Sequence, residues 1–184
     1  ISSWWVNIHG HSHPVLNQAL REQAETLEHI MFAGFTHRPA IELAEKLIKI
    51  LPDGLTKVFY SDNGSTAVEV ALKMAYQFWR NRGEERKTFV ALENAYHGDT
   101  FGAMAASGES AFTHPFKTLL FNVLRTETNI ESVEKIFRSH SKEIAAIIVE
   151  PILQAAGGML IYSSEFLQKV RQLCDEYKIL LIAD

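Results

Sequence analysis

Two runs of apolar residues, each ending in a carboxylate, constrain the fold of this chain more than any other feature. They are AAIIVE at residues 145–150 and ILLIAD at residues 179–184. A strand with one face in water alternates apolar and polar residues, whereas a strand buried on both faces is apolar throughout. Strand-like and helix-like segments also alternate along the chain. The sequence therefore predicts an α/β fold with a mostly parallel sheet covered by helices on both faces.

Hydrophobic periodicity and turn residues predict the individual elements. Helices are expected at residues 14–30, 39–51, 65–83, 100–107, 130–141 and 164–178. Strands are expected at residues 56–60, 87–93, 119–124, 144–150 and 179–184. Ligands of such sheets bind beyond the carboxyl ends of the strands, so the residues that follow each strand are the candidates for a functional site.

The composition argues against several classes of function. The chain has 18 Lys and Arg against 22 Asp and Glu, a net charge of −4, which argues against a nucleic-acid partner. Neither the ~20 consecutive apolar residues of a membrane span nor the pattern of a signal peptide is visible in these residues. The single cysteine, Cys174, excludes an internal disulfide and suits a small buried residue. We therefore expect a cytoplasmic protein with small-molecule partners.

The segment SDNGSTAVE follows the first expected strand and opens a long helix. Asn63 and Gly64 suit a tight turn, and Ser65 or Thr66 could cap the helix. Thr66 and Glu69 have the spacing of a capping box. A helix start with a glycine and hydroxyl groups is also suited to binding a phosphate. These residues alone leave plain helix capping and phosphate binding both open.

The ends of the other strands carry the remaining candidates. Tyr96 and His97 lie in a loop beside Gly98, where an aromatic ring either stacks on a flat ligand or anchors its own loop. Glu150 and Asp184 end the two apolar runs. A carboxylate at a buried strand end must be solvated, paired or bound. Metal ligation, general acid–base chemistry and pairing with a cationic cofactor remain open.

Taken together, these motifs resemble a known family. The Gly-Ser-Thr helix start, NAYHGDTFGAM, IIVEPILQAAGGM and LLIAD are similar to the large domain of the class III (ornithine-type) aminotransferases. These are fold type I enzymes that use pyridoxal 5'-phosphate. The resemblance covers the whole chain and implies a set of cofactor-binding residues: Asn63, Gly64, Ser65, Tyr96, His97, Glu150 and Asp184.

The resemblance also gives Tyr96 and Asp184 catalytic roles. Tyr96 would stack on the pyridine ring, and Asp184 would pair with the ring nitrogen. Opposite charges favour each other's charged forms, so an ionised Asp184 would keep that nitrogen protonated and the ring electron-withdrawing. At ~4 Å and an effective dielectric of ~20, the pair is worth roughly 4 kcal/mol before desolvation.

Other segments resemble one branch of the family, which acts in biotin biosynthesis. They are SSWW, MFAGFTHRPAIELAEKL and DNGSTAVEVALKMA. This branch transfers an amino group from S-adenosylmethionine to 8-amino-7-oxononanoate to give 7,8-diaminononanoate. The resemblance implies that Trp4 and Trp5, with Tyr96, line the substrate pocket. SSWW as an aromatic core patch, and another class III ω-aminotransferase with an ornithine, diamine or ω-amino acid donor, remain the alternatives.

The resemblance implies two regions. Residues 1–50 would form an N-terminal segment with substrate-pocket and interface helices, and residues 51–184 the N-terminal part of the cofactor-binding large domain. Homodimers are expected, with EHIMFAGFTH either at the interface or in a buried loop. No lysine here matches the expected Schiff-base lysine, so we expect that residue and a C-terminal small domain beyond residue 184. The chain alone is then expected to be an inactive fragment.

Two further interpretations compete with an aminotransferase. His9, His11 and His13 alternate in HGHSHP, which would suit a metal-dependent hydrolase, but the Gly and Pro favour a loop and we expect no metal. The second interpretation is a degenerate aminotransferase fold that serves only as a binding module. The joint presence of Tyr96, Glu150 and Asp184 argues against that module.

Overall fold

The computed structural model describes residues 2–184 and divides into two compact units. The first unit is Ile1–Phe59 and the second is Tyr60–Asp184. The second unit contains the sheet and most of the predicted site residues.

The first unit contains two amphipathic helices, α1 (Pro14–Thr26) and α2 (Arg38–Ile48). Each has a proline in its first turn, where the missing N–H group is not needed for helical hydrogen bonding. The predicted helix over 14–30 ends earlier because Leu27 adopts extended backbone. Ala40 is the one buried residue of the two helices, so this unit leaves both apolar helix faces uncovered.

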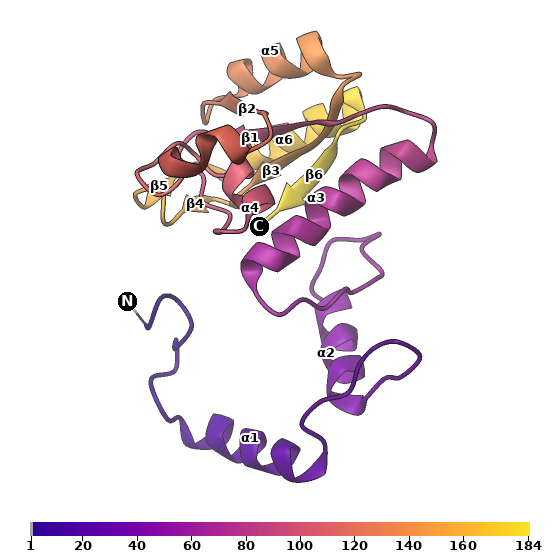
Figure 1. The fold of residues 1–184 in the computed structure, drawn as a ribbon, viewed down its shortest axis with the longest axis vertical. Helices are drawn as coiled ribbons and strands as arrows, with labels where there is room; N and C mark the ends of the chain where they lie inside the picture. The colour runs from indigo at the N-terminus through magenta and orange to yellow at the C-terminus, as the bar shows by residue number, and fades with distance from the viewer. Residues whose placement is uncertain (1) are drawn as a thin grey trace. The chain divides into compact units, whose positions relative to one another are not determined.

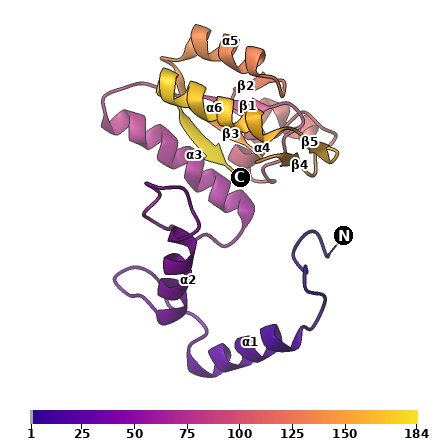
Figure 2. The same ribbon diagram turned by 180° about the vertical axis from the view of Figure 1, so that it is seen from behind.

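The second unit is built around a four-stranded parallel sheet with the order β2-β1-β3-β6 (Figures 1 and 2). The strands are β1 (Thr88–Leu92), β2 (Val123–Thr126), β3 (Ile144–Val149) and β6 (Leu180–Ala183). All six residues of β3 are buried, as the apolar run predicts. The expected α/β class is confirmed.

Helices cover both faces of this sheet. Helices α3 (Gly64–Asn81) and α4 (Phe101–Ala106) pack on one face, against alternate residues of β1 and β3 such as Ala91 and Ile148. Helices α5 (Ile130–His140) and α6 (Ser164–Tyr177) pack on the other, against Val90 and Ile147. Burial on both faces explains why the strands lack polar alternation.

Side-chain caps fix where the longer helices begin. Asn63 caps α3: its side chain accepts from the Thr66 N–H at 2.9 Å, and the Thr66 hydroxyl accepts from the Asn63 N–H at 3.3 Å. Asn129 and Ser163 cap α5 and α6 in the same manner. The predicted capping box of Thr66 and Glu69 is therefore wrong, because the helix starts three residues earlier than that pairing requires.

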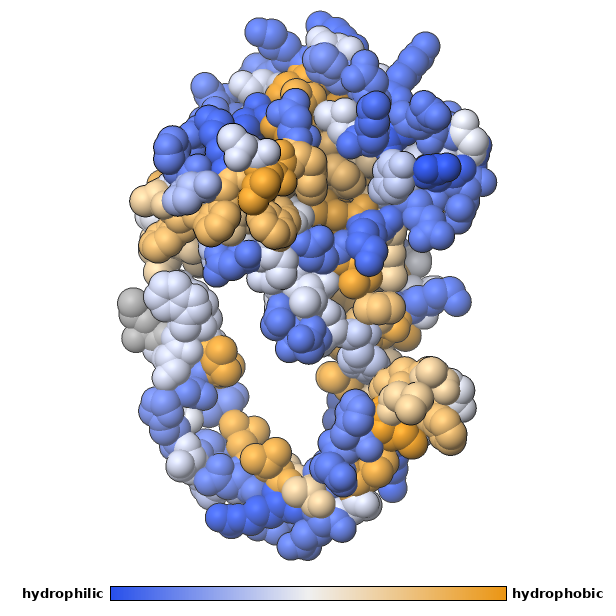
Figure 3. Space-filling model, viewed as in Figure 1, coloured by the Kyte–Doolittle hydropathy of each residue, from blue (hydrophilic) through white to orange (hydrophobic). Residues whose placement is uncertain are grey.

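The local structure differs from the predictions at three other places. Residues 56–60 form no strand, because no other described strand supplies a hydrogen-bonding ladder for them. The strand expected at 119–124 lies at β2, after the 3-10 helix η1 (His114–Leu119). A hairpin of β4 (Leu153–Gln154) and β5 (Leu160–Ile161) was not predicted. Figure 3 shows that apolar residues gather over this hairpin, which is too short to give a periodic pattern.

Arg86 joins three segments of the chain at the amino-terminal end of the sheet. The side chain is 7% exposed and donates to the carbonyl oxygens of Ser141 at 3.1 Å and Lys178 at 2.7 Å. It pairs with Glu84 at 2.7 Å, and its guanidinium lies 3.7 Å from the centre of the Trp79 ring. One cation thus joins the segments that enter β1, β3 and β6.

Among residues 2–184, no helix is long and apolar enough to cross a lipid bilayer.

Candidate active site

The predicted site residues of the second unit meet at the carboxyl end of the sheet. Strands β3 and β6 are neighbours in register, with Val149 opposite Ala183. The acids that follow them, Glu150 and Asp184, therefore lie at adjacent strand ends. The N–H of Asp184 donates to the Val149 carbonyl at 2.9 Å and extends the ladder by one residue. Parallel pairing thus brings together two carboxylates that are far apart in the sequence.

A buried histidine holds Asp184. The His97 Nδ1 lies 2.7 Å from Asp184 Oδ2, and the His97 side chain is fully buried while 30% of the Asp184 side chain is exposed. An ionised carboxylate only accepts hydrogen bonds, so Nδ1 carries the hydrogen. The His97 N–H donates to Ser107 Oγ at 2.8 Å, which fixes the backbone beneath the ring. Asp184 is thereby oriented, with part of its carboxylate left accessible.

The His97 Nε2 atom is buried and has no hydrogen-bond partner among residues 2–184. Because the His97 side chain is buried and hydrogen-bonded to Asp184, it holds the Asp184 carboxylate in place. Sequence reasoning assigned His97 to the cofactor site without identifying this contact. No local signal could have revealed it, because the two residues are 87 positions apart.

Glu150 anchors the loop that carries the aromatic residue. Its Oε2 accepts from the Tyr96 N–H at 3.1 Å, and its carbonyl oxygen accepts from the Tyr162 hydroxyl. Glu150 is buried, and this desolvation raises the pKa of its carboxyl group above the ordinary value, opposed by the Tyr96 N–H bond. The loop is thereby fixed to the end of β3.

The Tyr96 ring is 37% exposed, and its hydroxyl donates to Asp99 Oδ2 at 3.1 Å. Burial, followed by this hydrogen bond, raises the pKa of the Tyr96 hydroxyl. The hydroxyl therefore stays protonated at neutral pH and fixes the ring plane. The Tyr96 ring anchors its loop and also presents accessible aromatic surface. Loop anchoring and stacking on a flat ligand are therefore compatible roles for this residue.

The start of α3 packs closely against the same loop. The Asp99 N–H donates to Ser65 Oγ at 3.1 Å. Gly98 has φ +120°, and a Cβ added there would lie 2.0 Å from Ser65 Oγ and 2.7 Å from Ser65 Cβ. Only glycine fits this backbone conformation and this approach. Asp99, which bonds both Tyr96 and Ser65, is a site residue that sequence reasoning missed, although it directly follows the Tyr-His-Gly motif.

The α3 start leaves backbone donors available. Asn63 takes up the N–H groups of Thr66, through its side chain, and of Ala67, through its carbonyl. Among residues 2–184, the N–H groups of Gly64 and Ser65 have no acceptor. Because Ser65 Oγ accepts from Asp99, its own hydrogen remains available to donate. These three donors and the helix dipole suit an anion such as a phosphate.

Trp4 and Trp5 belong to the first unit, where both are exposed and their ring centroids are 6.2 Å apart. The other predicted site residues belong to the second unit. The assignment of Trp4 and Trp5 to the substrate pocket therefore stays a prediction.

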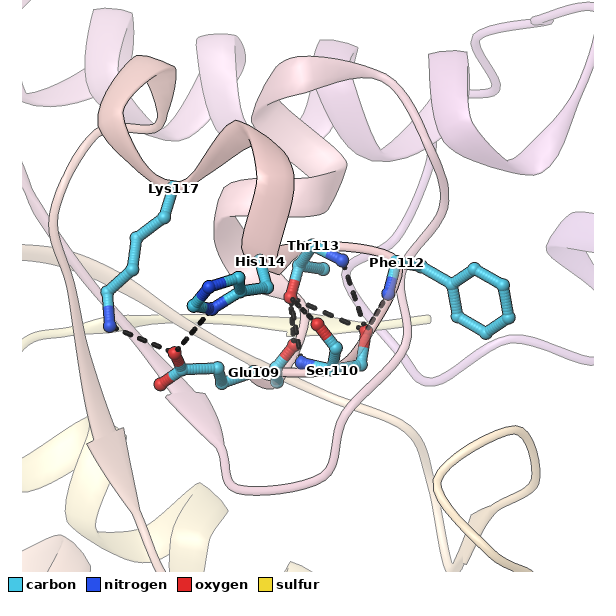
Figure 4. Close-up of polar contacts among 7 residues, drawn as sticks. Glu109, Ser110, Phe112, Thr113, His114 and Lys117 are labelled. Carbon is cyan, nitrogen blue, oxygen red and sulfur yellow. Dashed lines mark hydrogen bonds and ion pairs between the residues drawn. The ribbon is translucent and has the colours of Figure 1, made fainter.

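A cavity of about 520 Å³ is lined by residues that follow β1, such as Glu93, by residues of β2 and by the segment that leads into η1. Glu109 lines this cavity, and its carboxylate lies 2.9 Å from Lys117 Nζ and 3.6 Å from His114 Nδ1. Figure 4 shows both contacts. The Lys117 hydrogen bond lowers the pKa of Glu109. Arg125, also in the wall, donates to the carbonyls of Ala105 and Ala106 at 2.5 Å each. Lys117 and Arg125 are thus both paired within the chain, so neither is a free cation in this cavity.

The histidines of HGHSHP make polar and ring contacts instead of a cluster. The two ring nitrogens of His11 lie 3.2 Å from Ser3 Oγ and from Asn7 Nδ2. The His9 and His13 ring centroids are 5.9 Å apart. In the described chain, no three His, Cys, Asp or Glu side chains are arranged to hold a metal ion.

Comparison with known proteins agrees with this arrangement. The model of the family "Aminotransferase class-III" matches residues 1–184. An adenosylmethionine-8-amino-7-oxononanoate aminotransferase from Synechococcus elongatus is 48% identical, over 100% of this chain and 47% of its own length. The enzyme of the same name from Geobacter sulfurreducens is 42% identical, over 100% of this chain and 45% of its own.

Solved structures give the same result. The adenosylmethionine-8-amino-7-oxononanoate aminotransferase of Methanocaldococcus jannaschii superposes with a TM-score of 0.91 at 35% identity, over 95% of this chain and 41% of that one. An omega transaminase from Pseudomonas jessenii, in complex with PMP, gives 0.85 at 31% identity, over 94% and 43%. The chain spans less than half the length of each of these relatives. It belongs to the class III aminotransferase family.

Proposed function

We propose that this chain forms the N-terminal cofactor-binding part of an aminotransferase. Class III aminotransferases depend on pyridoxal phosphate. The observation that carries the proposal is the Asp184 carboxylate, held by a buried His97 and still accessible at the end of β6. A carboxylate of this kind suits a ring nitrogen that must stay protonated.

The residues of the site fit this cofactor chemically. The free N–H groups of Gly64 and Ser65, with the Ser65 hydroxyl, are donors for a phosphate. The partly exposed Tyr96 ring offers a stacking surface. Asp184 offers a negative charge for a pyridine nitrogen. Asn63 shapes the turn as the α3 cap, while Glu150 holds the Tyr96 loop.

Pyridoxal phosphate, when bound, supplies a protonated pyridine ring that withdraws electrons from the substrate carbon as its proton is removed. Asp184 keeps the proton on the ring nitrogen. His97 donates through Nδ1 to Asp184 and so fixes the direction of the carboxylate. Tyr96, whose hydroxyl is bonded to Asp99, would offer the cofactor's pyridine ring a stacking surface and shield it from water. Burial of His97 and Glu150 keeps this end of the sheet low in dielectric and strengthens the charge pair.

For the substrates, we propose S-adenosylmethionine as the amino donor and 8-amino-7-oxononanoate as the acceptor, giving 7,8-diaminononanoate in biotin biosynthesis. Support comes from relatives named for this reaction at 39–48% identity over the whole chain. Trp4 and Trp5 suit both substrates, since an indole face attracts a sulfonium cation and packs on methylene groups. An ω-aminotransferase with another donor is the second candidate, favoured by structural neighbours titled omega transaminase at TM-scores of 0.84–0.85.

We further propose a cytoplasmic homodimer, with residues 1–50 contributing to the substrate pocket and the interface, and residues 51–184 to the large domain. The lysine that binds the cofactor covalently is expected in the part of the family's length that this chain does not span. The exposed apolar faces of α1 and α2 support an interface role for the first region.

Half-reaction spectroscopy tests the function in a protein that carries this chain at the full length of its relatives. The protein is loaded with pyridoxal phosphate and mixed with S-adenosylmethionine, ornithine or a diamine. Loss of the cofactor's aldehyde-derived absorbance with S-adenosylmethionine, at a rate at least ~100-fold above the others, is expected for ~3 kcal/mol of donor discrimination. A faster response to ornithine or the diamine would favour the second candidate. Failure to retain the cofactor would contradict the assignment to this family's chemistry.

A further inference from the structure

Glu69 lies in α3, but its carboxylate makes hydrogen bonds to another helix. Its carboxylate Oε1 accepts from the N–H groups of Gly102 at 2.5 Å and Ala103 at 3.3 Å. These are the first-turn donors of α4, which lack intrahelical acceptors. The preceding Thr100 makes no side-chain cap, and α4 has no acidic residue in its own first turn. A side chain of α3 therefore caps α4.

The approach of Glu69 depends on a glycine in α4. A Cβ at Gly102 would lie 2.3 Å from one carboxylate oxygen of Glu69 and 2.7 Å from the other. Residues Gly102–Ala106 are all buried, so α4 cannot shift outward to relieve such a contact without losing core packing. The contact thus depends both on the Glu69 carboxylate and on the lack of a side chain at Gly102.

This contact is the second of two connections between the same segments. The first joins Ser65, at the start of α3, to Gly98 and Asp99. The second joins Glu69, one helical turn later, to the start of α4. Two connections one turn apart fix both the distance and the angle between α3 and the segment that follows Tyr96 and His97.

We propose that Glu69 is a positioning residue, which sets the phosphate-binding turn of α3 at the correct place relative to the loop that carries Tyr96 and His97. The inference rests on the proposed cofactor site and adds to it. A molecule with both a ring and a phosphate must satisfy both parts at once, whereas either group alone needs only one part. Glu69 therefore contributes to binding of the linked molecule and little to binding of either half.

The test compares two non-covalent probes in the full-length protein: 4-deoxypyridoxine 5'-phosphate, which has both groups, and 4-deoxypyridoxine, which has the ring alone. In Glu69→Ala the dissociation constant of the phosphorylated probe should rise about tenfold, equivalent to ~1.4 kcal/mol. The dissociation constant of the unphosphorylated probe should stay within about twofold. Glu69→Gln retains an acceptor oxygen and should restore phosphorylated-probe binding to within about threefold of wild type.

Gly102→Ala gives an independent test from the other side of the contact. Alanine favours a helix more than glycine does, so this variant should fold, yet its methyl group displaces the Glu69 carboxylate. The same selective loss of phosphorylated-probe affinity is expected. Glu134→Ala is the matched control, since it removes a helix carboxylate bonded only to Arg138 in its own helix, and both affinities should be unchanged.

Equal weakening of both probes in Glu69→Ala and Gly102→Ala, or no weakening of either, would overturn the positioning role. Wild-type protein that binds neither probe would overturn the proposed cofactor site itself, and the inference with it. A wild type that binds both probes, with selective loss in the two variants, supports both.

Discussion

Gly98→Ala probes the closest approach in the candidate site. Gly98 has φ +120°, a conformation that costs an L-amino acid roughly 1–2 kcal/mol. The new Cβ would lie 2.0 Å from Ser65 Oγ, 2.7 Å from its Cβ and 3.0 Å from its Cα. Rotation of the hydroxyl relieves the first contact, but the Cβ and backbone contacts require the loop to move, at roughly 1–3 kcal/mol. We expect a total destabilisation of about 2–5 kcal/mol.

Three further variants separate these contributions. Gly83, at the end of α3, has φ +77°, but a Cβ there meets nothing within 4 Å. Gly83→Ala should therefore show only the backbone cost, ~1–2 kcal/mol. Ser65→Gly removes the Oγ and Cβ atoms, so the double variant Gly98→Ala with Ser65→Gly should be more stable than the sum of the single variants by roughly 1–3 kcal/mol.

Equilibrium urea unfolding, followed by far-ultraviolet circular dichroism, measures all four variants against wild type. The close packing would be refuted if Gly98→Ala were no less stable than Gly83→Ala. It would also be refuted if the two single changes added within ~0.3 kcal/mol in the double variant. The free energy of unfolding is the quantity compared, so cofactor need not be present.

Three other predictions follow from individual side chains. Arg86→Met should lower the free energy of unfolding by roughly 3 kcal/mol in urea titrations, because it leaves two carbonyls and Glu84 without their cation; a loss under ~1 kcal/mol would contradict this. Burial raises the pKa of the Cys174 thiol to about 12, so a thiol reagent at pH 8 should label it only after unfolding; rapid labelling of folded protein would show otherwise. Burial also raises the pKa of Glu150 above 4.5 in the folded state. Wild-type stability should therefore fall relative to Glu150→Gln as pH rises from about 4.5 through that raised value, and a difference in melting temperature that is constant from pH 4 to pH 7 would count against it.

The local predictions succeeded where burial is periodic. Strands β1, β3 and β6 and helices α3 to α6 all lie where the apolar pattern places them, within a few residues. The segment 56–60 also contains apolar residues but forms no strand, because a strand needs a neighbouring strand to accept its backbone hydrogen bonds. The capping of α3 was misplaced for a related reason: Asn63 and Thr66 both have suitable side chains, and only the backbone geometry decides which caps.

The sequence by itself determined the α/β class and the position of two carboxylates at the ends of buried strands, since uninterrupted apolar runs require cover on both faces. Tertiary structure alone decided the partners of those carboxylates. Asp184 bonds to His97 and Glu150 to Tyr96 because parallel register and the loop after β1 bring them together. Periodicity encodes which face of an element is buried, whereas a hydrogen bond depends on distances and directions that exist only once the elements have packed.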